Sequence, residues 1–289
     1  MVIADMFRPA MFVSLGVYAK PENRVRALSF VRLSVNLGFA TGPVLGGLII
    51  LGLGYQGLFW IDGSTCILAI LIFAYFVKEK KKIVEHHDES DSSLETKSVF
   101  RDKPFWVFLF ISFTTAMLFF QIFTTLPLFH HEKFGLTEFE TGLLLSLNGI
   151  LIFMFEMPLV SILERKQVNR IKIIFTGALL MVISFYVLLI DFWVGILAVG
   201  IVFMTFGEIF AFPFSNAFAM GRAPRGQEGR YMALYTMSFS LAHILSSKMG
   251  LEIIGRFGYS TNWFVMGSLG VVAMFFCFWL HRLVRAENK

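Results

Sequence analysis

The chain has 289 residues, of which 56% are hydrophobic and only 16% are charged, and its formal net charge is +5. Soluble domains carry about 25% charged residues, so this composition leaves too little polar surface for a water-soluble globule. The basic residues lie in short clusters between apolar segments, which is typical of a membrane protein and excludes a nucleic-acid-binding surface.

The sequence shows none of the patterns that carry enzyme chemistry. Cys66 and Cys277 both lie inside apolar runs, so neither a disulfide framework nor a metal site is expected. The sequence contains no nucleophile motif, no phosphate-binding loop and no cluster of metal-ligating side chains. We therefore expect a protein that is not an enzyme and that has no cofactor.

Apolar stretches of about 20 residues predict membrane-spanning helices. A first segment, at about 1–19, is short and carries Asp5 and Arg8. Eight full segments follow in chain order, at 28–52, 57–77, 104–128, 139–162, 171–190, 193–219, 231–254 and 260–281. Residues 78–103 form the longest polar stretch, which predicts a solvated linker between two helical bundles.

The distribution of Lys and Arg predicts the orientation of these helices. Alternate connections hold 20 of the 25 basic residues, whereas the opposite connections hold only Lys133 and Arg256. Cytoplasmic loops carry the excess of Lys and Arg. The linker and the C-terminus are therefore expected in the cytoplasm of a multi-pass protein of the cell inner (plasma) membrane.

Two parts of the sequence agree when one is shifted by 204 residues. The match includes the dipeptides Gly54-Tyr55 with Gly258-Tyr259 and Ile49-Ile50 with Ile253-Ile254, in one ungapped register. Both copies follow a basic loop and end at a short turn, so they share one orientation and form a parallel repeat. Several predicted helices precede the second copy, but the sequence holds no equivalent helices ahead of the first copy. We therefore expect about three helices to be missing ahead of Met1, which would give twelve helices in the full repeat.

A motif in the first copy resembles a known family. Residues 38–47 contain Gly38, Gly42-Pro43 and Gly46-Gly47, similar to the fifth-helix signature of proton-coupled drug antiporters of the major facilitator superfamily. A further glycine of that signature is replaced by Ser29. Small residues let helices approach closely in lipid, and a proline kinks a helix. These residues therefore predict a packed helix that acts as a gate between the two halves. The alternative is ordinary small-residue packing with no gating role.

A connection further along also resembles this family. Glu164, Arg165 and Arg170 match its acidic-basic cytoplasmic loop motif, although Gln167 stands where a glycine is expected. The resemblance implies an all-α polytopic membrane protein, a major-facilitator-type helical bundle with about nine transmembrane helices of twelve. Residues 1–77 would form an incomplete N-terminal bundle (helices four to six of the family), 78–103 the cytoplasmic linker and 104–289 a six-helix C-terminal bundle.

Ionisable side chains inside the bilayer are costly and therefore mark functional positions. Glu208 lies near the middle of its apolar segment, and Asp5 and Arg8 are three residues apart on one helix face. The resemblance places these helices around the central cavity. A carboxyl group away from water ionises less readily, which suits reversible protonation during transport. The alternative for Glu208 is a structural hydrogen bond.

Uncharged polar residues also interrupt the apolar segments. We interpret them as candidates for substrate contact, with hydrogen bonding to their own helix as the alternative. They are Gln121, Thr124, Thr125, Asn148 and Asn216.

These patterns predict a secondary active transporter of small molecules that works by alternating access, with proton-coupled efflux favoured by the resemblance. Proton-coupled nutrient uptake is the alternative. A further alternative is that the chain is a transport-incompetent fragment of such a transporter. We expect these 289 residues alone not to transport. The expected partners are a small-molecule substrate, protons and the lipid bilayer, with no nucleic acid, and the protein is expected to be a monomer.

Overall fold

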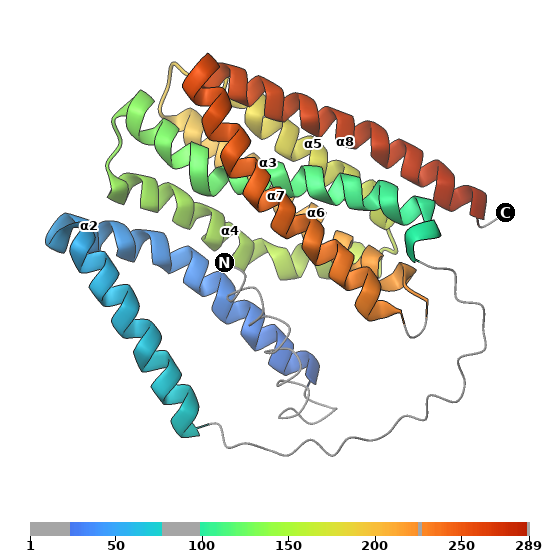
Figure 1. Cartoon of the computed structure of the whole chain (residues 1–289), viewed down its shortest axis with the longest axis horizontal. Coiled ribbons are helices and arrows are strands. Elements are labelled where there is room, and N and C mark those ends of the chain that lie inside the picture. Colours follow the sequence, from blue (N-terminus) through green and yellow to red (C-terminus); the bar gives the residue numbers. More distant parts are fainter. Residues whose placement is uncertain (1–23, 77–98, 225–226, 288–289) are drawn as a thin grey trace.

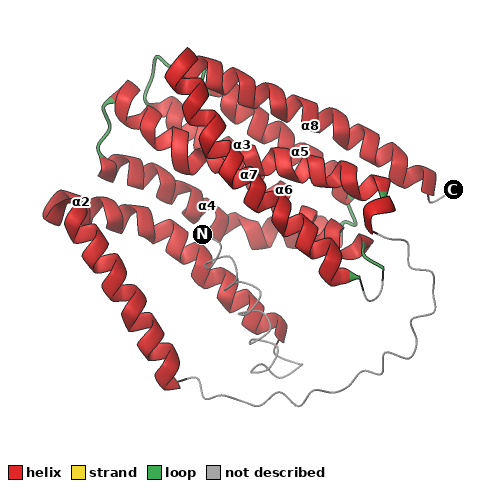
Figure 2. Ribbon diagram, viewed as in Figure 1, coloured by secondary structure: helices red, strands yellow, loops and turns green. Residues whose placement is uncertain are grey.

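A computed structural model describes residues 24–76, 99–224 and 227–287, and within these ranges every regular element is a helix (Figures 1 and 2). The predicted segment 1–19, with Asp5 and Arg8, lies outside the described residues, as does most of the linker at 78–103. The elements are α2 (Arg24–Phe76), the 3-10 turn η2 (Val99–Arg101), α3 (Lys103–Phe134), α4 (Glu138–Arg165), α5 (Arg170–Val187), α6 (Gly195–Arg222), α7 (Glu228–Phe257) and α8 (Tyr259–Glu287).

Local sequence signals explain where the central helices begin and end. Asp102 caps α3 by accepting a hydrogen bond from the backbone N–H of Phe105, at 3.1 Å. The helix ends at Gly135, whose φ of 65° is left-handed. Thr137 and Glu140 then form a reciprocal capping box that starts α4. Gly135, Thr137 and Glu140 thus confine the connection between α3 and α4 to a short turn.

The repeated Gly-Tyr dipeptide marks a sharp turn in both copies. Gly54 interrupts α2 with φ 67° and ψ −178°, so α2 is a hairpin of two arms, 24–53 and 55–76. Gly258 adopts nearly the same conformation, φ 85° and ψ 173°, between α7 and α8. Only glycine occupies this region readily. The turn predicted at each dipeptide is therefore confirmed, whereas the backbone of α2 stays helical through Pro43.

The predicted spans agree with the helices, and most helices run several residues beyond them. Among the described residues, six helices are long and apolar enough to cross a membrane. α2 counts as one of them although its hairpin supplies two arms. The seventh long helix, α7, falls short of this measure because polar residues interrupt its middle, namely Ser238, Ser240, His243, Ser246 and Ser247, with Lys248 and Glu252 following them.

The helices α3 to α8 form one bundle, and the first arm of α2 packs against α4 (Figure 1). Within the bundle, α3 contacts α7 and α8, and α5 packs on α6 and α8. Large fully buried side chains such as Phe105, Phe185 and Trp263 fill its core.

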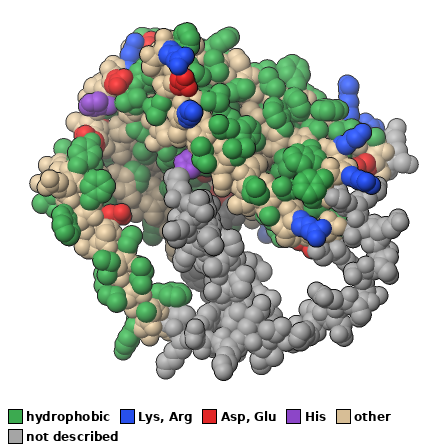
Figure 3. All heavy atoms as spheres, viewed as in Figure 1, with side chains coloured by type: hydrophobic (Ala, Val, Ile, Leu, Met, Phe, Trp, Pro, Cys, Tyr) green, Lys and Arg blue, Asp and Glu red, His purple; other side chains and the backbone are tan. Residues whose placement is uncertain are grey.

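The outer surface of the described chain is strongly apolar. Phe192, Trp60 and Tyr75 are 86%, 78% and 80% exposed, and hydrophobic side chains spread over the face shown in Figure 3. Apolar patches of this extent would drive aggregation in water, whereas the hydrocarbon core of a bilayer solvates them favourably. The chain is a membrane protein with several spanning helices.

Backbone-to-backbone contact joins α2 to α4 along one edge, which we call the α2–α4 seam. A Cβ atom added to Gly142 would lie 2.5 Å from the carbonyl oxygen of Pro43, and one added to Gly149 would lie 2.5 Å from the Cα of Ala40. A Cβ on Gly47 would lie 2.7 Å from the Cα of Phe139. These contacts fall in the first half of α4. Toward its other end the two helices diverge in Figure 1.

Candidate transport site between α4 and α6

Glu208 lies at the middle of α6, half-buried against α4. The side-chain amide of Asn148 donates to its carboxylate oxygen Oε2, at 3.1 Å, and to the hydroxyl of Thr205, at 2.9 Å. Thr205 in turn donates to the backbone carbonyl of Ile201, at 2.7 Å. No Lys or Arg of the described chain forms an ion pair with Glu208. This carboxyl group can therefore gain or lose a proton without breaking an ion pair.

The position of α6 is fixed by close packing on α5. A Cβ added to Gly177 would lie 2.7 Å from the backbone nitrogen of Ala211 and 2.8 Å from the carbonyl oxygen of Gly207. One added to Gly207 would lie 2.9 Å from the carbonyl oxygen of Gly177. Two glycines facing each other thus bring the backbones into contact directly behind Glu208.

Aromatic rings from four helices form a connected series beside this carboxylate. Phe212 lies one turn beyond Glu208 and packs edge-on against Phe119 of α3, at a centroid distance of 5.0 Å. We call the series the aromatic seam. It joins α2, α3, α6 and α7 through Phe39, Phe119, Phe120, Phe123, Phe212, Phe239 and His243.

The aromatic seam is not closed off inside the bundle. Phe39 is 49% exposed and Phe123 is 41% exposed, while the other rings are half-buried. An apolar or aromatic molecule could contact these ring faces and edges with little rearrangement. Spacing in the sequence did not single these phenylalanines out, because Phe is spread throughout the chain.

The polar residues predicted on α3 lie on two different faces. Gln121 is fully buried and donates its amide to the carbonyl and hydroxyl oxygens of Ser246 on α7, both at 2.9 Å. Its Oε1 accepts from Thr125, at 2.6 Å, and from Asn262 on α8, at 3.2 Å. Gln121 and Thr125 thus join three helices. Thr124 is half-buried and donates to the carbonyl of Phe120, at 3.4 Å.

The remaining predicted residues are distributed more widely. Asn216 is exposed on α6, two turns beyond Glu208. Of the motif at 38–47, Gly47 lies in the α2–α4 seam and Pro43 contributes its carbonyl there. Gly38 and Gly42 face open space, and Gly46 has only an ordinary contact with Leu58, at 3.7 Å. The substrate contacts and gating role stay predictions.

The loop motif lies at the connection between α4 and α5. Arg170 donates to the backbone carbonyl of Ala217 near the end of α6, at 3.1 Å, whereas Glu164 and Arg165 are exposed in the last turn of α4. Gln167 has a φ of 50°. This left-handed conformation is unfavourable for residues with a Cβ, so the position at which the resemblance expects glycine has the backbone shape that glycine favours.

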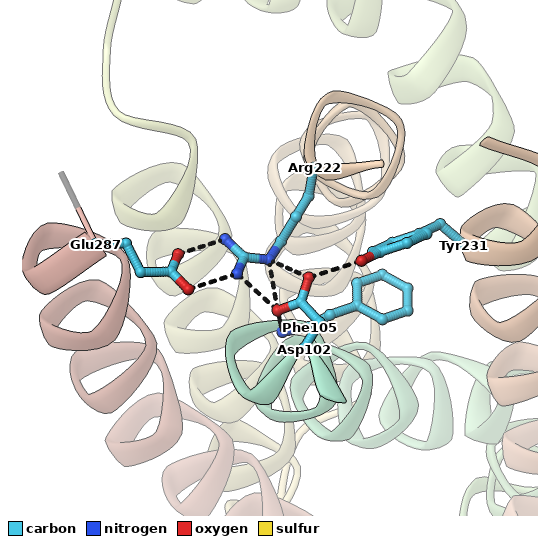
Figure 4. A network of polar contacts seen from close by, with 5 residues as sticks. All are labelled: Asp102, Phe105, Arg222, Tyr231 and Glu287. Carbon is cyan, nitrogen blue, oxygen red and sulfur yellow. Dashed lines mark hydrogen bonds and ion pairs between the residues drawn. The ribbon is translucent and has the colours of Figure 1, made fainter. Parts of the chain in front are cut away.

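A polar network that no sequence pattern indicated ties four helices together (Figure 4). Arg222, at the end of α6, pairs with Asp102 at 2.6 Å and with Glu287 of α8 at 2.9 Å. The hydroxyl of Tyr231 on α7 also donates to Asp102, at 2.9 Å. The Asp-x-Pro pattern at 102–104 could have indicated the cap, but not its distant partners.

Replacing Arg222 by Met should lower the free energy of unfolding by about 1–3 kcal/mol, because it leaves the largely buried carboxylate of Asp102 without its cation. This range lies below that of a fully buried pair, since Glu287 is 48% exposed. Thermal unfolding in detergent measures the change. Arg256→Met is the matched control, because its pair with Glu252 is exposed and should contribute less than about 1 kcal/mol. Equal losses in both variants would contradict the assignment.

Comparison with known proteins agrees with this architecture. The sequence profile described as Major Facilitator Superfamily matches residues 2–247. An uncharacterized MFS-type transporter, YttB of Bacillus subtilis (strain 168), is 23% identical over 86% of this chain and 62% of its own length. Multidrug resistance protein 2 of the same organism is 24% identical over 63% of this chain and 48% of its own length. The chain thus spans less than two thirds of either relative.

Solved structures share the fold. A D-xylose-proton symporter superposes with a TM-score of 0.67 at 18% identity, covering 92% of this chain and 65% of that one. One relative is named a transporter and the other a multidrug resistance protein, and the solved structure shows the shared fold. The chain belongs to the Major Facilitator Superfamily.

Proposed function

We propose that the protein is a secondary active transporter that exports small amphipathic molecules in exchange for protons, by alternating access. The observation that supports this most is the position of Glu208. It is a carboxylate at mid-helix, held by an amide and free of an ion pair with any described residue. A group that is costly to place in a membrane needs a task, and reversible protonation is a task that this environment permits.

The aromatic seam supports the substrate class. Its rings offer a broad apolar surface, and Phe212 lies one turn from Glu208 on the same face of α6. A molecule with a flat apolar body and a cationic group would contact both. One relative is named a multidrug resistance protein, and an apolar aromatic surface of this kind is compatible with several substrates.

The proposal also assigns the parts of the chain. Residues 1–77 belong to the N-terminal half, 78–103 form a cytoplasmic linker and 104–289 form the C-terminal half. The end of the bundle with Arg165, Arg170 and Arg222 faces the cytoplasm together with the C-terminus, following the excess of Lys and Arg there. The protein would then act as a monomer in the cell membrane, with Asp5 and Arg8 as further cavity residues.

Transport in liposomes tests this function. The protein would be reconstituted as this chain, which we expect not to transport by itself, and also with any in-frame sequence that its gene encodes ahead of Met1, to which the following expectations apply. Ethidium serves as the probe because it is flat, aromatic and cationic. An imposed pH gradient should drive ethidium against its concentration gradient, and an ionophore that dissipates the gradient should stop it. Flux that does not respond to the gradient would contradict proton coupling, and gradient-driven movement in the opposite direction would indicate uptake.

A further inference from the structure

The two repeated tyrosines make the same kind of bond in different places. The hydroxyl of Tyr55, in the turn of α2, donates to Oε1 of Glu138 at 2.8 Å. The hydroxyl of Tyr259, at the start of α8, donates to Oε2 of Glu132 at 2.7 Å. Both glutamates flank the short connection between α3 and α4. One dipeptide is thus used twice at the same end of the bundle, which we call the Gly-Tyr end.

The two bonds differ in what they connect. Tyr259 and Glu132 belong to the bundle α3–α8, in which the helices pack side by side. Tyr55 instead joins α2 to the first residue of α4, directly above the α2–α4 seam. Gly47 contacts Phe139, and Pro43 contacts Gly142, within the next turns. The hydrogen bond of Tyr55 therefore joins α2 to α4 at the end of the seam in which glycines let the two helices approach closely.

Among the described glycines, the close backbone contacts of the α2–α4 seam lie between Gly47–Phe139 and Ala40–Gly149, and Figure 1 shows the ribbons of α2 and α4 diverging beyond them, toward the C-terminal end of α4. If the proposed alternating access holds, this arrangement is the state closed at the Gly-Tyr end. To reach the other state, α2 must leave the start of α4, and the bond between Tyr55 and Glu138 must then break.

We infer that Tyr55 and Glu138 form a latch that holds the Gly-Tyr end closed, so that its strength sets the balance between the two states. The inference rests on the proposed function for its meaning, but the latch can be measured without transport. An exposed hydrogen bond to a carboxylate shifts a two-state balance only modestly. That modest strength suits a contact that must open and close in every cycle.

Distances between spin labels test the latch in lipid nanodiscs. Trp60 and Phe192 are 78% and 86% exposed, and they lie on α2 and on the connection between α5 and α6. Both would be replaced by Cys and labelled, with Cys66→Ser removing the exposed native thiol. Tyr55→Phe should raise the ratio of long to short distances by about two- to five-fold. Glu138→Ala should do the same, which guards against a folding defect in either single variant.

Tyr259→Phe is the matched control, because it removes the same hydroxyl from the same dipeptide inside one half. It should leave the distance distribution unchanged. Unchanged distances in both Tyr55→Phe and Glu138→Ala would overturn the latch, and so would an equal shift in Tyr259→Phe. Failure of proton-driven flux with a normal shift in these distances would count against the proposed function and leave the latch standing.

Discussion

Glu208→Gln should reduce pH-gradient-driven flux of ethidium by about a hundred-fold or more, the lower end of what a single proton-transfer group contributes. Gln has nearly the shape of Glu, and its side-chain oxygen can still accept the hydrogen bond from Asn148. It cannot release or take up a proton, however. The variant should therefore keep its fold and its downhill exchange of substrate, and lose only the coupling to protons. Parallel assays of driven flux and of exchange without a gradient measure the two properties separately.

Glu252→Gln is the control for this substitution. Glu252 lies on α7, 49% exposed, in an ion pair with Arg256, so it is not placed to couple protons to transport. Driven flux in that variant should match the wild type. Normal coupling in Glu208→Gln would remove Glu208 from the mechanism, and loss of coupling in both variants would show that the assay reports a general defect.

Gly177→Val should strongly destabilise the fold, because its side chain would meet backbone atoms of α6 that cannot move without separating the two helices. The closest are the nitrogen of Ala211, at 2.7 Å, and the carbonyl oxygen of Gly207, at 2.8 Å. Overpacking typically costs about 1–3 kcal/mol and occasionally more, and contact with backbone favours the upper end of this range. We expect a large loss of monodisperse protein after detergent extraction and a clear fall in the thermal unfolding midpoint.

Gly255→Val tests whether the effect is specific to this contact. Gly255 lies in α7 and has open space where its side chain would be, so the substitution carries only the helix propensity of valine. Extraction and thermal unfolding should resemble the wild type. If Gly177→Val behaved like Gly255→Val, the close approach of α5 and α6 would be wrong.

Much of the fold could be predicted because lipid imposes simple rules. A spanning helix needs about 20 apolar residues, and this length located the helices from α3 to α8. The glycine of each Gly-Tyr dipeptide needs a positive φ that other residues avoid, so the repeat located both Gly54 and Gly258 at turns. Glu208 could be singled out because a charged residue in the middle of an apolar run is rare and needs a reason.

The partners of these residues could not be predicted, since they come from contacts between distant helices. Nothing near Gln121 in the sequence indicates that its amide binds Ser246 and its Oε1 binds Asn262, on two other helices. In the sequence, Arg222 resembles an ordinary basic residue at the end of an apolar segment. Only the structure shows that it pairs with both Asp102 and Glu287. Periodicity shows which face of a helix is polar but not which helix lies opposite.

If Glu208 carries the exchanged proton, a bound cationic substrate and that proton should exclude each other there, and proton release on binding tests this most directly. Ethidium would be added to the purified protein in weakly buffered detergent solution with a pH indicator. The account predicts that the wild type releases protons in proportion to bound ethidium, and that Glu208→Gln binds ethidium without releasing any. Equal release from both proteins, or binding to the wild type with no release, would contradict it.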